Sequence, residues 1–136
     1  MDLRIYLYDK LVSDARQLRE EVFVQELCVE NEFDDKENKS VHVIIYDGRE
    51  PVAYARLCTE DGMSVIDHVC VKKEYRLKKL GRRAVAALEE DANKSGFSFS
   101  YAYPTHASEG FFEKIGYTPD ISGGYKKEFK VKIKLH

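Results

Sequence analysis

The sequence predicts an α+β domain in which helices cover a mixed, mostly antiparallel sheet. Three observations carry this prediction: three consecutive strand patterns joined by tight turns, a strand–helix–strand unit after them, and helical patterns between strands. A chain of 136 residues fits one core, and 43% hydrophobic with 34% charged residues is typical of a folded globular protein. We therefore expect a single domain over residues 1–136.

The first elements are a strand and an amphipathic helix. In residues 3–8, aliphatic side chains alternate with arginine and tyrosine side chains, which predicts a strand with one buried face. Asp9 offers an N-cap, and from Lys10 apolar residues recur at helical spacing while Arg19 is assigned to the charged side. If the helix reaches Glu26, this carboxylate extends the apolar stripe, and burial would raise its pKa toward that of a general base. The alternative is a frayed last turn that leaves Glu26 in water.

An acidic loop and three strands follow. Residues 29–40 are rich in acids and lack periodicity, which predicts a surface loop that either is solvated or attracts an amine. Turns at Asp47-Gly48 and Glu60-Asp61-Gly62 then separate three strands, expected at residues 41–46, 51–58 and 64–71.

The remaining elements complete a strand–helix–strand unit. A helix carrying Ala84, Leu88 and Ala92 on one face should end at Gly96, and residues 97–101 alternate as a strand. A short helix is expected between Thr105, as its cap, and Gly116. The alternating residues 125–135 predict a last strand with lysines on one face.

The loop between the strand expected at residues 64–71 and the helix that follows it is strongly basic. Residues 72–83 hold seven basic residues against a single acid, although a helix N-terminus ordinarily favours acids. This pattern predicts a phosphate-bearing ligand, whereas the alternative is a solvated basic loop. The net charge of −2 argues against a general nucleic-acid binder, so a small molecule is the expected anion.

The spacing of the cysteines and the hydropathy of the sequence indicate the cellular compartment. Cys28, Cys58 and Cys70 are odd in number and far apart, which predicts neither disulfides nor a metal site. The N-terminus does not resemble a signal peptide, and no apolar run approaches the roughly 18 residues of a membrane span. We expect a cytoplasmic protein without a membrane or nucleic-acid partner.

Four motifs in order resemble the GNAT superfamily of acetyl-CoA-dependent N-acetyltransferases, over nearly the whole chain. Residues 69–83, V-C-V-K-K-E-Y-R-L-K-K-L-G-R-R, are similar to its central strand and pyrophosphate loop, V-x-V-x-x-x-[FY]-R-G-x-G-x-G. Residues 111–117, F-F-E-K-I-G-Y, resemble its F-Y-E-K-L-G-F helix. Residues 19–26 and 53–57 look like small GNAT proteins related to bacterial ElaA.

The resemblance implies a three-layer GNAT fold with about four helices and a sheet of six to seven strands that splays at the CoA site. It also implies acetyl-CoA as cosubstrate, with no metal. The residues that the resemblance assigns to cofactor binding are Val69, Cys70, Val71, Arg76, Leu77, Lys78, Lys79, Leu80, Gly81, Arg82 and Phe112.

Two departures from the family pattern bear on mechanism. Leu77 and Lys79 replace glycines, but even a loop with negative φ values there can point its N–H groups inward, and Lys78, Lys79 and Arg82 can add charge, so we expect CoA binding to be retained. Phe112 stands where the family commonly has a tyrosine that protonates the CoA thiolate. Other tyrosines are candidates to replace that acid: Tyr101, Tyr103, Tyr117 and Tyr125.

By resemblance, a neutral amine attacks the acetyl thioester directly, and a backbone N–H near Val69 or Cys70 holds the carbonyl oxygen. Cys70 is expected to pack rather than react. The candidate bases for the protonated amine are Glu26, Asp67 and His68.

The expected partner is a small-molecule or peptide amine, and the protein is expected to be a monomer or a homodimer. The runner-up function is a non-catalytic acetyl-CoA-binding module, and a third is a domain that binds a partner's phosphate through the basic loop.

Overall fold

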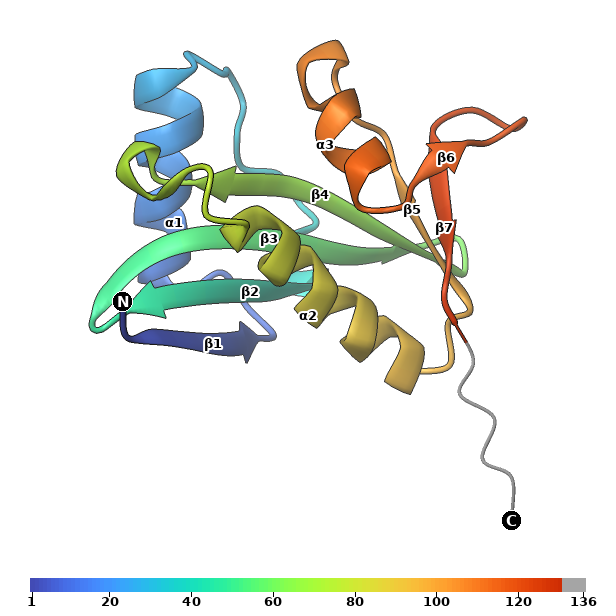
Figure 1. Cartoon of the computed structure of the whole chain (residues 1–136), viewed down its shortest axis with the longest axis horizontal. Coiled ribbons are helices and arrows are strands. Elements are labelled where there is room, and N and C mark those ends of the chain that lie inside the picture. Colours follow the sequence, from blue (N-terminus) through green and yellow to red (C-terminus); the bar gives the residue numbers. More distant parts are fainter. Residues whose placement is uncertain (131–136) are drawn as a thin grey trace.

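A computed structural model of the chain describes residues 1–130. Over this range a seven-stranded sheet has the order β1-β2-β3-β4-β5-β7-β6 (Figure 1). All neighbouring strands are antiparallel except β4 and β5, which confirms the mixed, mostly antiparallel sheet. The strands are β1 (Leu3–Tyr8), β2 (Ser40–Asp47), β3 (Glu50–Glu60), β4 (Met63–Val71), β5 (Phe99–Ala102), β6 (Thr118–Pro119) and β7 (Tyr125–Glu128).

Three α-helices lie within residues 1–130, slightly fewer than the four expected. They are α1 (Ser13–Arg19), α2 (Leu80–Lys94) and α3 (Glu109–Lys114). The first continues directly as a π-helix, η1 (Glu20–Glu26), and short 3₁₀ turns are η2 (Glu37–Lys39), η3 (Lys73–Tyr75) and η4 (His106–Ser108). None of the helices among the described residues is long and apolar enough to cross a membrane.

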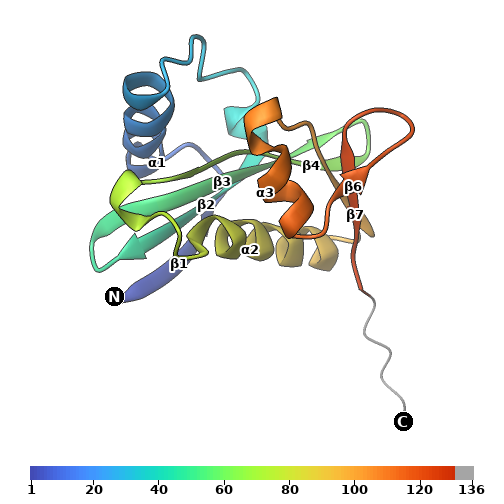
Figure 2. The same ribbon diagram turned by 45° about the horizontal axis from the view of Figure 1, so that its top comes forward.

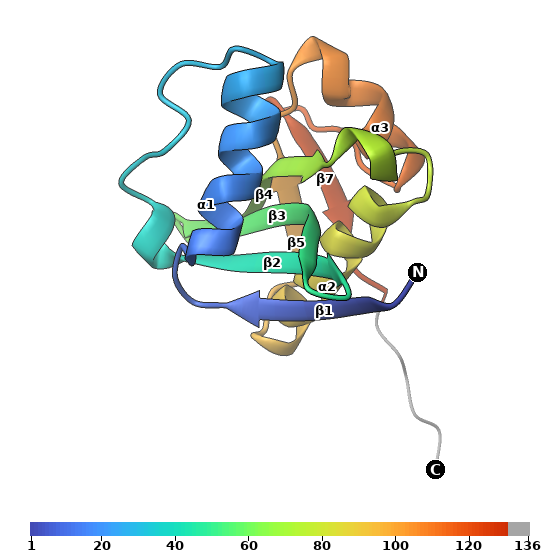
Figure 3. The same cartoon turned by 90° about the vertical axis from the view of Figure 1, so that its left-hand side faces the viewer.

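Helices cover both faces of the sheet, α1 on one and α2 with α3 on the other (Figures 2 and 3). The predicted stripe of α2, Ala84, Leu88 and Ala92, is fully buried in the larger core cluster, which confirms it. On the opposite face, Leu18 and other α1 residues pack against Ile44 of β2. Each face of the sheet therefore has its own apolar core.

Some predicted boundaries were wrong. The first helix begins at Ser13, with Val12 rather than Asp9 at its N-cap position. Ile5 and Leu7 are 36% and 42% exposed because β1 is an edge strand, so the predicted buried face is only partly buried. The predicted last strand is described over Tyr125–Glu128, and its end at 131–135 lies outside the described residues.

The centre of the sheet is irregular in two ways. Between residues 1 and 130, Val65 with Tyr101 is the one register pair between β4 and β5, and Figure 1 shows these strands together at one end and apart at the other. Opposite β3, the register of β4 slips, so that His68 and its neighbour form a bulge, and His68 has φ +53°. A bulge bends its strand, which suits the departure of β4 from β5.

Candidate functional site

The backbone of the basic loop is left-handed at both positions where this sequence lacks the glycines of the GNAT pattern. Leu77 has φ +64° and Lys79 has φ +63°, so the loop is not of the kind with negative φ values at these positions. The loop thus has a glycine-type conformation without glycines. This backbone strain costs roughly 1–2 kcal/mol for each of the two residues. The Leu77 side chain is fully exposed and offers no packing to offset this strain. The compensation must come from contacts elsewhere in the loop.

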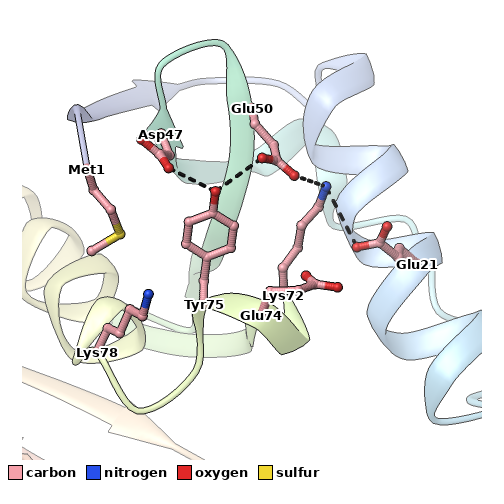
Figure 4. A pocket seen from close by; sticks show the side chains of 8 residues that line it. All are labelled: Met1, Glu21, Asp47, Glu50, Lys72, Glu74, Tyr75 and Lys78. Atoms are coloured by element: carbon pink, nitrogen blue, oxygen red, sulfur yellow. Dashed lines mark hydrogen bonds and ion pairs between the residues drawn. The ribbon is translucent and has the colours of Figure 1, made fainter.

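One set of contacts ties the loop to the β2–β3 hairpin (Figure 4). The Tyr75 hydroxyl donates to Asp47 Oδ2 at 2.8 Å and to Glu50 Oε2 at 3.2 Å. Lys72 Nζ donates to the other oxygen of Glu50 at 3.0 Å. These groups line a cavity of about 560 Å³ beside the loop. Because these side chains already bond to one another, their hydrogen bonds anchor the loop to the hairpin.

Arg76 ties the loop to the π-helix η1. Its Nη1 and Nη2 each lie 2.7 Å from an oxygen of Glu26, and its Nε donates to the Val71 carbonyl at 3.0 Å. The hydrogen bonds from Arg76 lower the pKa of Glu26, so the expected raised pKa was wrong. The reason lies in the helix: it changes to π geometry after Arg19, which turns Glu26 away from the apolar stripe that ends at Val22.

The strained loop gives a direct test of backbone conformation. Leu77→Gly should raise the free energy of unfolding by about 0.5–1 kcal/mol, because relief of left-handed strain exceeds the roughly 0.4–1 kcal/mol of added unfolded-chain entropy. Leu77→Val should lower it, since a β-branched residue tolerates positive φ poorly. Urea unfolding of the two variants measures both effects. Equal stability of the two would contradict the left-handed backbone.

The start of α2 joins the basic loop to the core. Leu80 and Gly81 are buried, whereas the side chains of Lys78, Lys79 and Arg82 are exposed. A Cβ added to Gly81 would lie 3.2 Å from the Phe111 ring and 3.6 Å from Val69, so glycine permits close packing of α2. Backbone N–H groups at a helix N-terminus with cations beside them are suited to a pyrophosphate.

Strand β4 carries the neighbouring predicted residues. Val69 and Val71 pack against the α2 core, whereas Cys70 faces the α1 core and is 5% exposed. Burial raises the pKa of the Cys70 thiol well above its ordinary value, so the thiol is inert at neutral pH, as expected for a packing residue.

The ring of His68, a candidate base, lies close to two acidic side chains, those of Asp67 and Glu32. Its Nδ1 is buried 3.0 Å from Asp67 Oδ1, off the direction of a hydrogen bond, and its Nε2 lies 3.5 Å from Glu32 Oε1. The Phe23 ring meets it edge-on at 5.9 Å. Although burial raises the pKa of Asp67, contacts with His68 and Arg56 lower it to about 2. Asp67 is therefore a poor base, suited instead to orienting the ring.

A buried ionic network lies beneath α1 and η1. Arg19 is fully buried and contacts Glu32 at 2.9 Å and Glu37 at 2.7 Å, so its assignment to the solvent side was wrong. The spacing contained the signal: Arg19 lies four residues after Ala15 and three before Val22, within the apolar stripe.

The predicted acidic surface loop supplies most of this network. Glu32 and Glu37 are only 6% and 7% exposed, and Asp34 binds Arg56 at 2.8 Å. Arg56 also binds Asp67 with two hydrogen bonds of 2.8 Å. The network therefore sets two guanidinium groups, of Arg19 and Arg56, against four carboxylates, of Glu32, Asp34, Glu37 and Asp67.

This excess of carboxylates adjoins His68 and favours a cationic ligand there. Burial raises the pKa of Glu32, so this carboxyl holds a proton more readily than an exposed glutamate. In residues 1–130, no cluster of three or more His, Cys, Asp or Glu is arranged to hold a metal ion.

The tyrosines near α3 are mostly committed to the fold. Phe112 is 4% exposed and packs edge-on against Tyr117. The Tyr117 hydroxyl donates to Glu89 at 2.8 Å and contacts Ser100, and burial raises its pKa, so it is a poor acid. Tyr125 donates to Glu113 at 3.2 Å. The two other predicted candidates, Tyr101 and Tyr103, lie on β5 or directly after it.

Comparisons with known proteins identify the family and the fold of the chain. The chain matches the sequence model of the "Acetyltransferase (GNAT) family" over residues 6–117. The uncharacterized N-acetyltransferase YjcF of Bacillus subtilis (strain 168) is 36% identical over 111 residues, which cover 80% of this chain and 79% of YjcF. Solved structures that share the fold include those of ElaA and PaiA.

Escherichia coli ElaA has a TM-score of 0.78 at 21% identity, with 94% of this chain and 100% of ElaA covered. The PaiA N-acetyltransferase of Thermoplasma acidophilum, in complex with coenzyme A, has a TM-score of 0.74 at 14% identity, with 95% and 100% covered. The family match spans most of the sequence and YjcF supports it independently, so the chain belongs to the acetyltransferase (GNAT) family.

Proposed function

We propose that this protein is an N-acetyltransferase that transfers the acetyl group of acetyl-CoA directly to a primary amine of a small molecule or peptide. One observation carries the proposal. The bulge that presents His68 lies on the strand that leads into a basic, left-handed loop, and a carboxylate-rich network adjoins the same histidine. A phosphate-binding element and a cation-attracting site thus meet on β4.

The residues of the loop fit CoA. Backbone N–H groups from Leu77 to Arg82 would hold the pyrophosphate, and the exposed Lys78, Lys79 and Arg82 would add charge. Beyond its pair with Tyr101, β4 turns backbone groups toward the space that β5 leaves, where an extended ligand arm can bond to them. PaiA, which shares this fold, forms a complex with coenzyme A, and this supports CoA as the ligand of the present protein. Acetyl-CoA supplies an activated acyl thioester.

The acceptor side supplies charge and a base. The carboxylate excess draws in a protonated amine, and His68 Nε2 accepts its proton while Asp67 sets the orientation of the ring. A backbone N–H near Val69 or Cys70, released from regular pairing by the bulge, stabilises the carbonyl oxygen. A thiol of pKa near 8.5 is a tolerable leaving group without an acid, so Phe112 does not abolish transfer.

Binding and turnover can be measured separately. Acetyl-CoA at about 100 times its Kd should stabilise the protein by roughly 2.7 kcal/mol in thermal unfolding. Release of free CoA thiol, followed with a panel of primary amines and polyamines, then detects transfer. An absence of any thermal shift at millimolar acetyl-CoA would reject every CoA-dependent function, including this one.

A non-catalytic acetyl-CoA-binding module is the second candidate, favoured by the phenylalanine at position 112. A thermal shift with acetyl-CoA, joined to no amine-dependent thiol release over the whole panel, would support that function instead.

A further inference from the structure

The pair Glu26–Arg76 links two parts of the molecule that are fifty residues apart in sequence. Glu26 is the last residue of η1, whose N-cap residue Arg19 belongs to the carboxylate-rich network, and Arg76 lies in the basic loop. Two parallel hydrogen bonds of 2.7 Å join the carboxylate to the guanidinium, which is the strong, directional form of this ion pair. The side chains are 33% and 37% exposed, so bound ligands can reach and influence the pair.

Arg76 is fully engaged by the protein. Its Nε donates to the carbonyl of Val71, the last residue of β4, while the other two nitrogens bind Glu26. The guanidinium thus spans the base of the loop and is committed to bracing it. The left-handed residues Leu77 and Lys79 follow within three positions. A strained segment persists only where its surroundings fix it, and Arg76 is the residue directly before the first strained position.

Glu26 also lies close in sequence to residues of the carboxylate-rich network. Six residues beyond it the chain reaches Glu32, which lies 3.5 Å from His68 and 2.9 Å from Arg19. Asp34, slightly further on, binds Arg56. The chain from Arg19 through η1 to Glu26 therefore extends from the carboxylates beside the candidate base to the contact with Arg76.

We propose that Glu26 is a positioning residue that, through Arg76, holds the phosphate loop in its CoA-binding conformation and couples CoA binding to the acceptor side. The inference rests on the proposed acetyl-CoA-dependent function. Apparent affinity equals intrinsic affinity multiplied by the fraction of molecules in the competent conformation. Loss of the brace therefore weakens CoA binding without removing any group that touches CoA.

The first experiment is calorimetric titration of CoA into the intact protein. Glu26→Gln should weaken binding about five- to tenfold, and Arg76→Gln should do the same. The double variant should be no weaker than Arg76→Gln alone, because the two residues act as one unit. Glu30→Gln is the matched control, since it removes the same charge from an exposed residue four positions further on.

The second experiment distinguishes coupling from a local effect on the loop. Hydrogen exchange with and without saturating CoA should show protection of residues 20–26 as well as residues 72–82 in the wild type. In Glu26→Gln at saturating CoA, protection of residues 72–82 should remain while protection of residues 20–26 is lost. A merely structural role would change both regions whether or not CoA is present.

The outcomes separate this inference from the proposed function. Failure of the wild type to bind CoA overturns both. Wild-type binding with unchanged affinity in Glu26→Gln overturns the inference alone. The same holds if only Arg76→Gln weakens binding, because Arg76 would then act on the phosphate directly. CoA-dependent protection of residues 20–26 that survives in Glu26→Gln overturns the coupling.

Discussion

Replacing Arg19 with methionine should lower the free energy of unfolding by about 3–5 kcal/mol, the effect of removing one partner from a buried ion pair. The guanidinium is fully buried and is held by Glu32 and Glu37. Without it, Glu37 keeps Arg56 at 3.1 Å, but Glu32 loses its guanidinium partner in an almost fully buried site. Urea unfolding at pH 7 measures the loss.

Two comparisons test the cause of that loss. Arg16→Met removes an exposed guanidinium that lies over the Phe33 ring, and should change stability by less than about 1 kcal/mol. The deficit of Arg19→Met relative to the wild type should also depend on pH.

The sign of this pH dependence follows from Glu32. Burial raises its pKa in the folded protein, so its contribution to stability is greatest below the unfolded pKa and is lost as the pH rises through the folded pKa. Removing Arg19 raises that pKa further. The deficit should therefore shrink as the pH falls from 7 toward the ordinary glutamate pKa of about 4.3. A deficit that is independent of pH would mean that lost packing, rather than an unpaired carboxylate, destabilises the variant.

His68→Asn should reduce kcat for an active amine by about 10²- to 10⁴-fold, the range of general base catalysis. Asparagine is chosen because it tolerates positive φ, which preserves the bulge at φ +53°. Affinity for CoA, measured by titration, should stay within about twofold. The rate of the variant should rise with pH up to the pKa of the amine, because the free amine then forms without the enzyme's base.

The control for this variant is His106→Asn, which changes a fully exposed histidine in η4. It should leave kcat unchanged. If His68→Asn retains full activity at neutral pH, the base lies elsewhere, and Glu32 becomes the first residue to replace.

Local sequence signals predicted most of the fold. Gly48 and Gly62 mark the two meander turns, and both have the positive φ that makes glycine suitable there. The bulge in β4 could not be predicted, because alternation assumes an unbroken strand. Ile66 and Cys70 are both even-numbered, yet they face opposite cores, since the extra residue reverses the alternation after His68.

Prediction of the site was limited by contacts distant in sequence. The basic loop and His68 were identifiable from residue types alone, and they remain proposals for binding and catalysis. The partner of Glu26 could not be predicted, since Arg76 is fifty residues away and the π-helix changes the direction of the carboxylate. The left-handed backbone at Leu77 also opposes the ordinary preference of the residue, and only its surroundings hold it there.

For the proposed acetyl transfer, the one parallel register pair that residues 1–130 show between β4 and β5 sets activity against stability. A longer ladder between these strands would give more backbone hydrogen bonds, but it would fill the space beside the bulge with a neighbouring strand. Substitutions that straighten β4 should therefore be found readily in a selection for thermostability and be lost in a selection for acetyl transfer. The short ladder thus gives fewer backbone hydrogen bonds and leaves one edge of β4 accessible.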